Sequence, residues 1–394
     1  MTDDKKPAAV PSTAPVVSGP AGTSDATVGP EAASPAPARR RALLPWLVPL
    51  LLLAGVGGGI WWFVLRDTPA KRVERIMTEA RAAYDLFEYT RTEQLLLQAR
   101  DMIPAGAKGS DLNVGVHHNL GMLYRKQERW DEARDAFLHA ASLCGPDANE
   151  VRAEELFQVA QIAIHLNHPV PAGQALEAAI EAHPTRNTLH LSIIDLQLGY
   201  LKQPALADSS LRRFVRLCGR TPENLRDVAS IYFRRKFYAD SLLLSKSAAT
   251  AVDTMITAHV IVAKSLWRMG RAQEGLEYLE GPMTRYPQAV PLWTVHASLL
   301  VGAGRADEAV QSADRAIEIA PNDYDAHRVR MMALFNANRL DDALAQAMTC
   351  RKMTGNTNEA HFLESMMARI RSRQQGKDDR PSTATDGGTP DNGS

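Results

Sequence analysis

The sequence predicts an all-α protein: a right-handed α-solenoid of repeated helix pairs, preceded by a disordered tail and one transmembrane helix. Three observations support this fold class. Residues 114–147 carry apolar side chains at helical spacing in two short segments, separated by a polar turn and ended by Gly145 and Pro146. Windows of the same kind recur later in the chain at a fixed spacing of 34 residues. An uncharged apolar stretch covers residues 42–65.

Residues 1–41 form a Pro/Ala-rich tail that also contains Ser, Gly and Thr and ends in the basic residues Arg39, Arg40 and Arg41. Before this basic end the tail has almost no aromatic or large aliphatic side chains. A segment of this composition cannot offset its ordering entropy by burial, so we expect it to be disordered. A short partner-binding motif within it is the alternative, and a plain flexible tail is favoured.

Residues 42–65 are long enough to form a helix that crosses a lipid bilayer. At about 1.5 Å per residue, two dozen residues span a hydrocarbon core of roughly 30 Å. Trp46 near one end and Trp61 and Trp62 near the other suit the two membrane interfaces. A cleaved signal peptide is the rival interpretation, but the apolar run is too long and no A-x-A cleavage site follows it. The prediction is a retained, single-pass membrane anchor.

The basic residues on both sides of this segment bear on its orientation. Arg39, Arg40 and Arg41 touch its N-terminal edge, which favours a cytoplasmic N-terminus. Arg66 and Lys71 follow soon after the other edge and weaken the bias. We therefore expect a bacterial inner-membrane protein whose C-terminal repeat domain lies outside the cytoplasm.

The stretch 114–147 resembles the tetratricopeptide repeat (TPR), a helix-turn-helix unit of about 34 residues. The resemblance rests on an L-G-x2-Y motif, an A-x3-F motif and a late proline, formed by Leu120, Gly121, Tyr124, Ala133, Phe137 and Pro146. His117 departs from the family pattern, because it stands where Trp is usual. One such unit cannot bury its own apolar face, so neighbouring repeats are expected.

Residues 73–357 accommodate about eight such repeats. The window 187–221 is degenerate, since no single frame satisfies all of its small positions. After it the register is strict, with repeats that start at Pro222, Ile256, Val290 and Tyr324. Small side chains are expected where the paired helices cross, and Met331 is the one poor fit. The crossing positions are Ala229, Ala263, Ala297 and Met331 in first helices and Ser241, Gly275, Ala309 and Ala343 in second helices.

A solenoid needs its last apolar face covered. Residues 358–372 show one more amphipathic pattern, with Phe362, Leu363, Met366 and Ile370 on one face, and are predicted to form a capping helix. Residues 373–394 are polar and rich in Gly and Asp, which predicts a disordered tail.

Composition and motifs argue against an enzyme, a cofactor site, a metal site or nucleic-acid binding. Lys+Arg and Asp+Glu both number 45, so the total charge does not favour a polyanionic partner. Cys144, Cys218 and Cys350 are far apart and form no CxxC motif. The repeat region lacks a Walker loop, a GxSxG elbow and an HExxH motif.

The histidines and paired carboxylates have simpler interpretations than catalysis or metal binding. Packing and surface roles are favoured for His117, His118, His165 and His168. The pairs Glu154-Glu155 and Asp341-Asp342 are expected on or beside exposed helix starts, where the helix dipole and solvent stabilise them.

The resemblance implies a concave groove lined by the first helix of each repeat. Mapped onto this sequence, the groove positions hold cations that flank two aromatic residues in two adjacent repeats. The candidate partner-binding residues are Arg226, Phe233, Arg234, Lys264, Trp267 and Arg268. An ordinary solvated helical face is the alternative interpretation of these cations. The functional interpretation is a groove for an extended or helical peptide that bears acidic groups.

The sequence therefore predicts a membrane-tethered scaffold for protein–protein interaction, anchored in the lipid bilayer through residues 42–65. Its partner is expected to be a protein or peptide with acidic groups, and nucleic acid is not expected. The alternative function is that of an accessory or regulatory subunit of an envelope-biogenesis enzyme complex.

Overall fold

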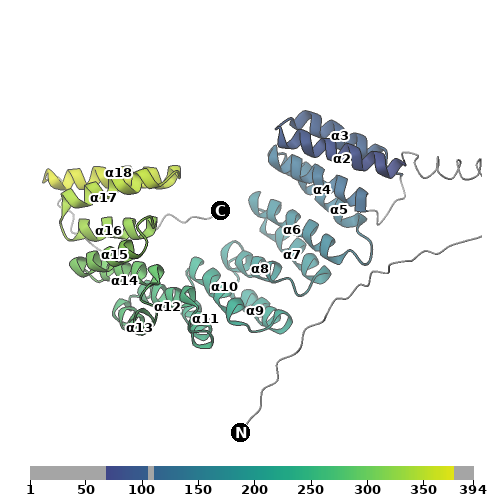
Figure 1. The fold of residues 1–394 in the computed structure, drawn as a ribbon. Coiled ribbons are helices and arrows are strands. Elements are labelled where there is room, and N and C mark those ends of the chain that lie inside the picture. The colour runs from purple at the N-terminus through teal and green to yellow at the C-terminus, as the bar shows by residue number, and fades with distance from the viewer. Residues whose placement is uncertain (1–67, 105–110, 377–394) are drawn as a thin grey trace, which may run out of the picture. The chain divides into compact units, whose positions relative to one another are not determined.

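The computed structural model describes residues 68–104 and 111–376, all within the structural unit Asp67–Ser394. Every regular element in these two ranges is an α-helix (Figure 1). The predicted tail 1–41 and the predicted transmembrane helix 42–65 lie outside the described residues, as does all but the start of the predicted tail 373–394. Among the described helices, none combines the length and the apolar character that crossing a membrane requires.

Seventeen helices are described, and the first sixteen form eight consecutive pairs. The first helices of the pairs are α2 (Pro69–Asp85), α4 (Asp111–Lys126), α6 (Asn149–His165), α8 (Asn187–Gly199), α10 (Pro222–Arg234), α12 (Ile256–Arg268), α14 (Val290–Gly302) and α16 (Tyr324–Asn336). The second helices are α3 (Tyr89–Asp101), α5 (Trp130–Leu143), α7 (Pro169–Ala182), α9 (Pro204–Cys218), α11 (Tyr238–Ala251), α13 (Ala272–Arg285), α15 (Ala306–Ile319) and α17 (Leu340–Met353). The last helix is α18 (Thr357–Gln374).

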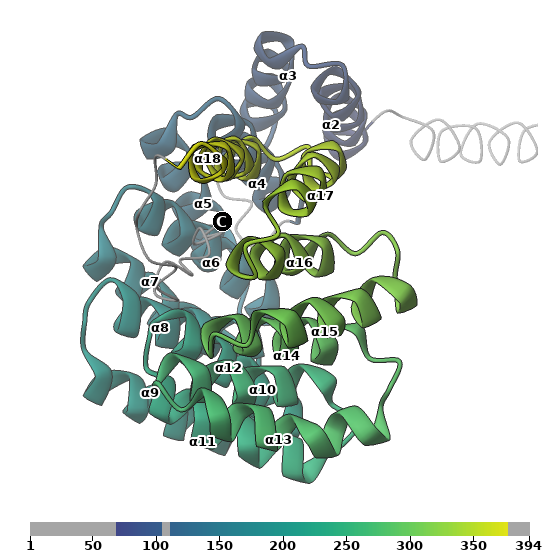
Figure 2. The same ribbon diagram turned by 90° about the vertical axis from the view of Figure 1, so that its left-hand side faces the viewer.

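The pairs stack on one another to make an all-α helical-repeat solenoid. The helices of each pair pack together, and the first helices α8, α10, α12, α14 and α16 also contact one another in sequence. The second helices α9, α11 and α13 lie along one side of this row, each packed against the first helix of its own pair (Figures 1 and 2). Helices α10, α12, α14 and α16 begin at the four residues where the sequence places repeat starts.

The turn inside each pair contains one residue in the left-handed region. In the first turn the N–H of Glu88 donates to the carbonyl of Ala83 at 2.9 Å, and Phe87 has φ 62°. This is the bonding that closes a helix C-terminus with a left-handed residue. Gly270 and Gly304 meet the requirement without a Cβ, at φ 77° and 76°. Phe87 meets it with a bulky side chain that is 73% exposed.

Small side chains occupy the crossings of the paired helices. A Cβ on Gly121 would lie 2.7 Å from the Phe137 ring, so only glycine fits there without displacing the ring. Ala229, Ala263 and Ala297 are 0% exposed, as the predicted crossings require. Met331, the predicted poor fit, is also 0% exposed. Its flexible, unbranched side chain packs within the buried cluster that also contains Cys350 and Ile370.

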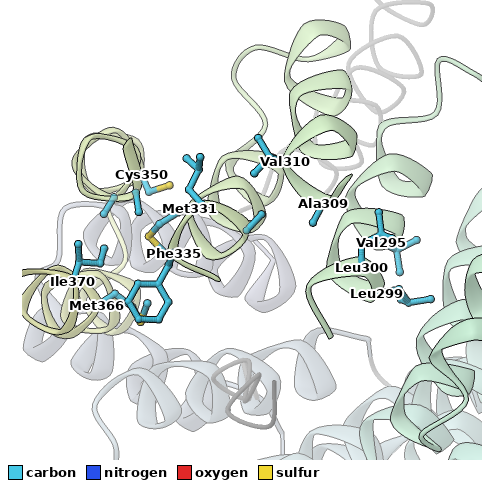
Figure 3. Packing of buried hydrophobic residues seen from close by; sticks show 14 of the residues in the cluster. Val295, Leu299, Leu300, Ala309, Val310, Met331, Phe335, Cys350, Met366 and Ile370 are labelled. Atoms are coloured by element: carbon cyan, nitrogen blue, oxygen red, sulfur yellow. The ribbon is translucent and has the colours of Figure 1, made fainter. Parts of the chain in front are cut away.

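The largest buried cluster runs from α12 to α18. Figure 3 shows Met331 and Phe335 of α16 directed toward Cys350 of α17 and toward Met366 and Ile370 of α18. Because α18 supplies apolar side chains to the last pair, it covers the face that a further repeat would otherwise bury.

The degenerate window 187–221 folds into α8 and α9. Helix α8 is buried around most of its circumference, from Leu189 and His190 to Leu198 and Gly199. A helix enclosed in this way has no polar face that would reveal its register. Gly199 makes room for the guanidinium of Arg235, which forms two 2.8 Å hydrogen bonds with Asp195.

Candidate functional site

The predicted partner-binding residues lie on two neighbouring first helices. Arg226, Phe233 and Arg234 belong to α10, and the other three belong to α12, which contacts α10. Residues three, four, seven or eight apart share one side of a helix. None of the six side chains is buried. The structure therefore brings the six residues onto adjacent helices, as the repeat register implies.

The arginines of α10 are partly neutralised by acidic side chains close to them. Arg226 pairs with Asp227 at 2.6 Å. Arg234, with its side chain 52% exposed, reaches Asp195 of α8 at 3.4 Å, where Arg235 also binds. Exposed pairs of this kind are weak and are readily exchanged for a carboxylate of a partner. These pairs orient the two arginine side chains but leave both able to bind a carboxylate of a partner.

Lys264 of α12 is accessible to solvent but closely surrounded by protein. This desolvation lowers the pKa of its ammonium group. Asp325 of α16 opposes the shift, whereas Arg328 of α16 and Arg268 of α12 add to it. The ammonium therefore senses charges from both α12 and α16, and an incoming carboxylate would relieve the repulsion among these cations.

The two predicted aromatic residues are each fixed by a different neighbour. Phe233 packs against Tyr238 with ring centroids 5.4 Å apart. Trp267 covers Gly302 of α14 so closely that a Cβ there would collide with the indole nitrogen. The guanidinium of Arg268 stands 5.2 Å from the Trp267 ring. Both rings are thus partly exposed and held in position before a partner arrives.

Sequence reasoning missed a hydrogen-bonded pair between α4 and α6, formed by His118 and the buried Glu155. The expectation of an exposed carboxylate is wrong for Glu155, whose side chain is 3% exposed. Its Oε1 lies 2.8 Å from Nδ1 of His118. A signal was present, because Glu155 precedes the buried Val159 and Ile162 at helical spacing and so falls on the buried face.

The hydrogen bond to Glu155 raises the pKa of His118, against the opposing effect of burial. This pair lies at a cleft of about 720 Å³ lined by α4, α6, the loop between α5 and α6, His183 after α7, and Arg186. Arg186 pairs with Glu154 at the same cleft. In the described part of the chain, no three His, Cys, Asp or Glu side chains gather in a way that could hold a metal ion.

Two stretches of the chain match models of the tetratricopeptide repeat, residues 114–147 and residues 290–323. The chain contains TPR repeats. No curated protein matches it in sequence.

Several solved structures are similar. A TPR protein from Parabacteroides merdae is 15% identical, with 66% of this chain and 98% of that chain covered and a TM-score of 0.42. A thermophilic TPR protein of Thermus thermophilus is 14% identical, with 55% and 98% covered and a TM-score of 0.37. Yeast Tom70 is 11% identical, with 85% and 95% covered and a TM-score of 0.39.

TPR repeats generally mediate protein–protein interactions, and the fold is typically a non-catalytic scaffold that binds a protein or peptide.

Proposed function

We propose that this chain is a membrane-tethered scaffold that binds an acidic protein or peptide along its first helices, with α10 and α12 as the main contact. One observation carries the proposal. Accessible cations flank two aromatic rings, Phe233 and Trp267, that neighbouring side chains already hold in place. An aromatic surface fixed in advance loses little entropy on binding, and the cations attract acidic groups from a distance.

The aromatic and charged residues are expected to affect different steps of binding. Buried aromatic contacts slow dissociation, whereas charges at the rim mainly speed association. A partner segment with an acidic side chain next to an apolar one would place the carboxylate between Arg234 and Arg268, and the apolar side chain would cover Trp267.

Trp267→Ala is expected to speed dissociation of the partner by roughly tenfold or more, the usual effect of removing an aromatic anchor. Arg234→Glu combined with Arg268→Glu should slow association and abolish or invert its salt dependence. Stopped-flow association at two ionic strengths measures both effects, once crosslinking in native membranes has supplied the partner. The crosslinked neighbours would also reveal whether the partner is an enzyme.

A matched control is available on the second helix α9. Arg212→Glu combined with Arg216→Glu changes the net charge equally, and both side chains lie outside the core. This control should leave association close to that of the unaltered chain. If both double variants slow association equally, the effect comes from net charge and not from the α10 and α12 cations. If neither double variant changes association, these cations belong to an ordinary solvated face.

The membrane tether is tested separately from the groove. We expect the full-length chain to stay with the membrane through an alkaline carbonate wash, and a chain without residues 42–65 to be released. A mature N-terminus beyond residue 65, or full-length chain in the wash, would contradict the tether. A cysteine introduced near the C-terminus should react with a membrane-impermeant thiol reagent while the cytoplasmic membrane is still intact. The parent chain, which lacks this cysteine, gives the background labelling.

A further inference from the structure

The turn between α2 and α3 exposes two large apolar side chains, Phe87 at 73% and Leu86 at 68%. The ring of Phe87 meets that of Tyr89 edge-on, with centroids 6.2 Å apart. Tyr89 in turn lies 5.8 Å from Tyr84 by the same measure, and both tyrosines are partly exposed. These four side chains, which we call the α2–α3 tip, form an apolar and aromatic cluster that faces solvent.

The other seven turns inside the described pairs carry no large apolar side chain at the position of Phe87. Each turn has one residue in the left-handed region, where a bulky side chain is strained. Polar residues or glycine occupy the seven equivalent positions, which are Glu128, Asn167, Lys202, Lys236, Gly270, Gly304 and Asn338. An exposed phenylalanine there stabilises neither the turn nor the core, which indicates that it contacts something apolar outside the solenoid.

The position of the tip in the chain favours a lipid bilayer as this contact. Only three residues separate the proposed membrane anchor 42–65 from Pro69, where α2 begins. Helix α2 has 17 residues and is about 25 Å long, so the tip stays within roughly 40 Å of the end of the anchor. A tether this short raises the effective concentration of lipid at the tip, so even a weak contact is occupied.

The side chains of the tip suit the interface of a bilayer. Aromatic residues are enriched there, because the ring of a tyrosine lies against apolar groups while its hydroxyl stays in water. The acidic Glu88, next to Phe87, pairs with Arg91 at 3.0 Å, which reduces the cost of bringing its charge to the interface.

We propose that the α2–α3 tip inserts into the interfacial layer of the membrane that holds the anchor, with Leu86 and Phe87 among the lipid tails. Helix α2 then lies along the membrane surface instead of standing upright on it. Asp85 remains in the water-facing layer, so the contact depends on apolar burial and needs no anionic lipid. The inference rests on the proposed tether, which supplies the bilayer, and is independent of the groove on α10 and α12.

The test uses the full-length chain in bilayer discs of phosphatidylcholine, doped with a phospholipid that carries a photoreactive diazirine in its acyl chain. After illumination and digestion with trypsin, mass spectrometry identifies the peptides that carry lipid. The tip lies in the tryptic peptide 82–91, and the anchor lies in the peptide 42–66. The peptide 237–246 is a matched negative control, because it contains Leu243 of α11, which is 71% exposed. We expect lipid on 42–66 and 82–91 and none on 237–246.

Phe87→Asn should lower the yield of lipid-bearing peptide 82–91 by about tenfold, the change in partitioning expected for one large apolar side chain. Asparagine tolerates the left-handed region and already occupies it in two other turns, at Asn167 and Asn338, so the fold is kept. Phe87→Trp should retain the yield, since an aromatic ring is restored. Leu243→Asn, which also removes an exposed apolar side chain, should leave the yield on 82–91 unchanged.

The peptide 42–66 separates a failure of this inference from a failure of the tether. Lipid on 42–66 with none on 82–91 would overturn the inference and leave the tether standing, and lipid on neither peptide would overturn both. A yield on 82–91 that survives Phe87→Asn, or that is no higher than the yield on 237–246, would also overturn the inference.

Discussion

Replacing Phe137 by alanine is expected to lower the free energy of unfolding by about 3–5 kcal/mol, the usual cost of removing a large aromatic side chain from a core. Phe137 is 0% exposed. Its ring lies over Gly121 and makes an edge contact with His118, with centroids 5.7 Å apart. The cavity would open at the crossing of α4 and α5, where glycine cannot fill it. Solenoid stability depends on each interface with the next repeat, so α6 should also be weakened.

Hydrogen exchange followed by mass spectrometry locates this effect along the chain. Amides of α4, α5 and α6 should exchange faster in Phe137→Ala, while those of α14 to α18 should change little. Leu138→Ala is the matched control, because Leu138 is the next residue of α5 and is 43% exposed. It should change stability by no more than about 0.5 kcal/mol. Equal effects of the two substitutions would mean that the helical register of α5 is wrong.

The architecture could be predicted because one short pattern recurs. Small residues such as Ala263, Ala297 and Ala309 mark the helix crossings in the sequence, and all three are 0% exposed. Their spacing follows from the geometry of a helix pair that must bury one face on the next pair. Helix α8 is harder to read, because its burial extends around the helix and erases the amphipathic pattern.

The candidate sites were less predictable, because charge positions depend on long-range contacts. The repeat register places Arg234 and Arg268 at equivalent positions, but it does not reveal that Asp195 pairs with Arg234. The partner of Glu155 is His118, 37 positions away in the sequence. A single glutamate on an apolar helix face indicates an unusual burial, but the neighbouring repeat decides what stabilises it.

Lowering the pH from 7 to 5 is expected to destabilise the protein through His117 and to stabilise it through the adjacent His118. Burial lowers the pKa of His117 to about 4, and the nearby His139 and Arg100 add to the shift. An unfolded histidine titrates near pH 6.5, so the unfolded chain takes up this proton first. Stability from a neutral, half-buried His117 is therefore present above about pH 6.5 and is lost as the pH falls toward 4. By pH 5 part of this stability is lost, at most about 2 kcal/mol, because solvent screens the half-buried ring.

His117→Leu should remove this loss, because an apolar side chain packs in the same place without titrating. Its unfolding midpoint in urea should fall less between pH 7 and pH 5 than that of the unaltered chain. The ring of His139, with its centroid 4.2 Å from that of His117, would remain as the nearest titrating neighbour. A variant with the same pH dependence as the unaltered chain would contradict the assignment to His117.

His118→Gln is expected to change the acid sensitivity of the protein in the opposite direction to His117→Leu. Glu155 raises the pKa of His118, so the stability gained from the charged pair is full below the unfolded pKa of about 6.5 and is lost as the pH rises through the folded value. Glutamine keeps a hydrogen bond to Glu155 but cannot take up the proton. The His118→Gln variant should therefore be more sensitive to acid than the unaltered chain, whereas His117→Leu should be less sensitive. If both substitutions change the acid sensitivity in the same direction, the pKa values of His117 and His118 are not shifted in opposite directions, and the assignment is wrong.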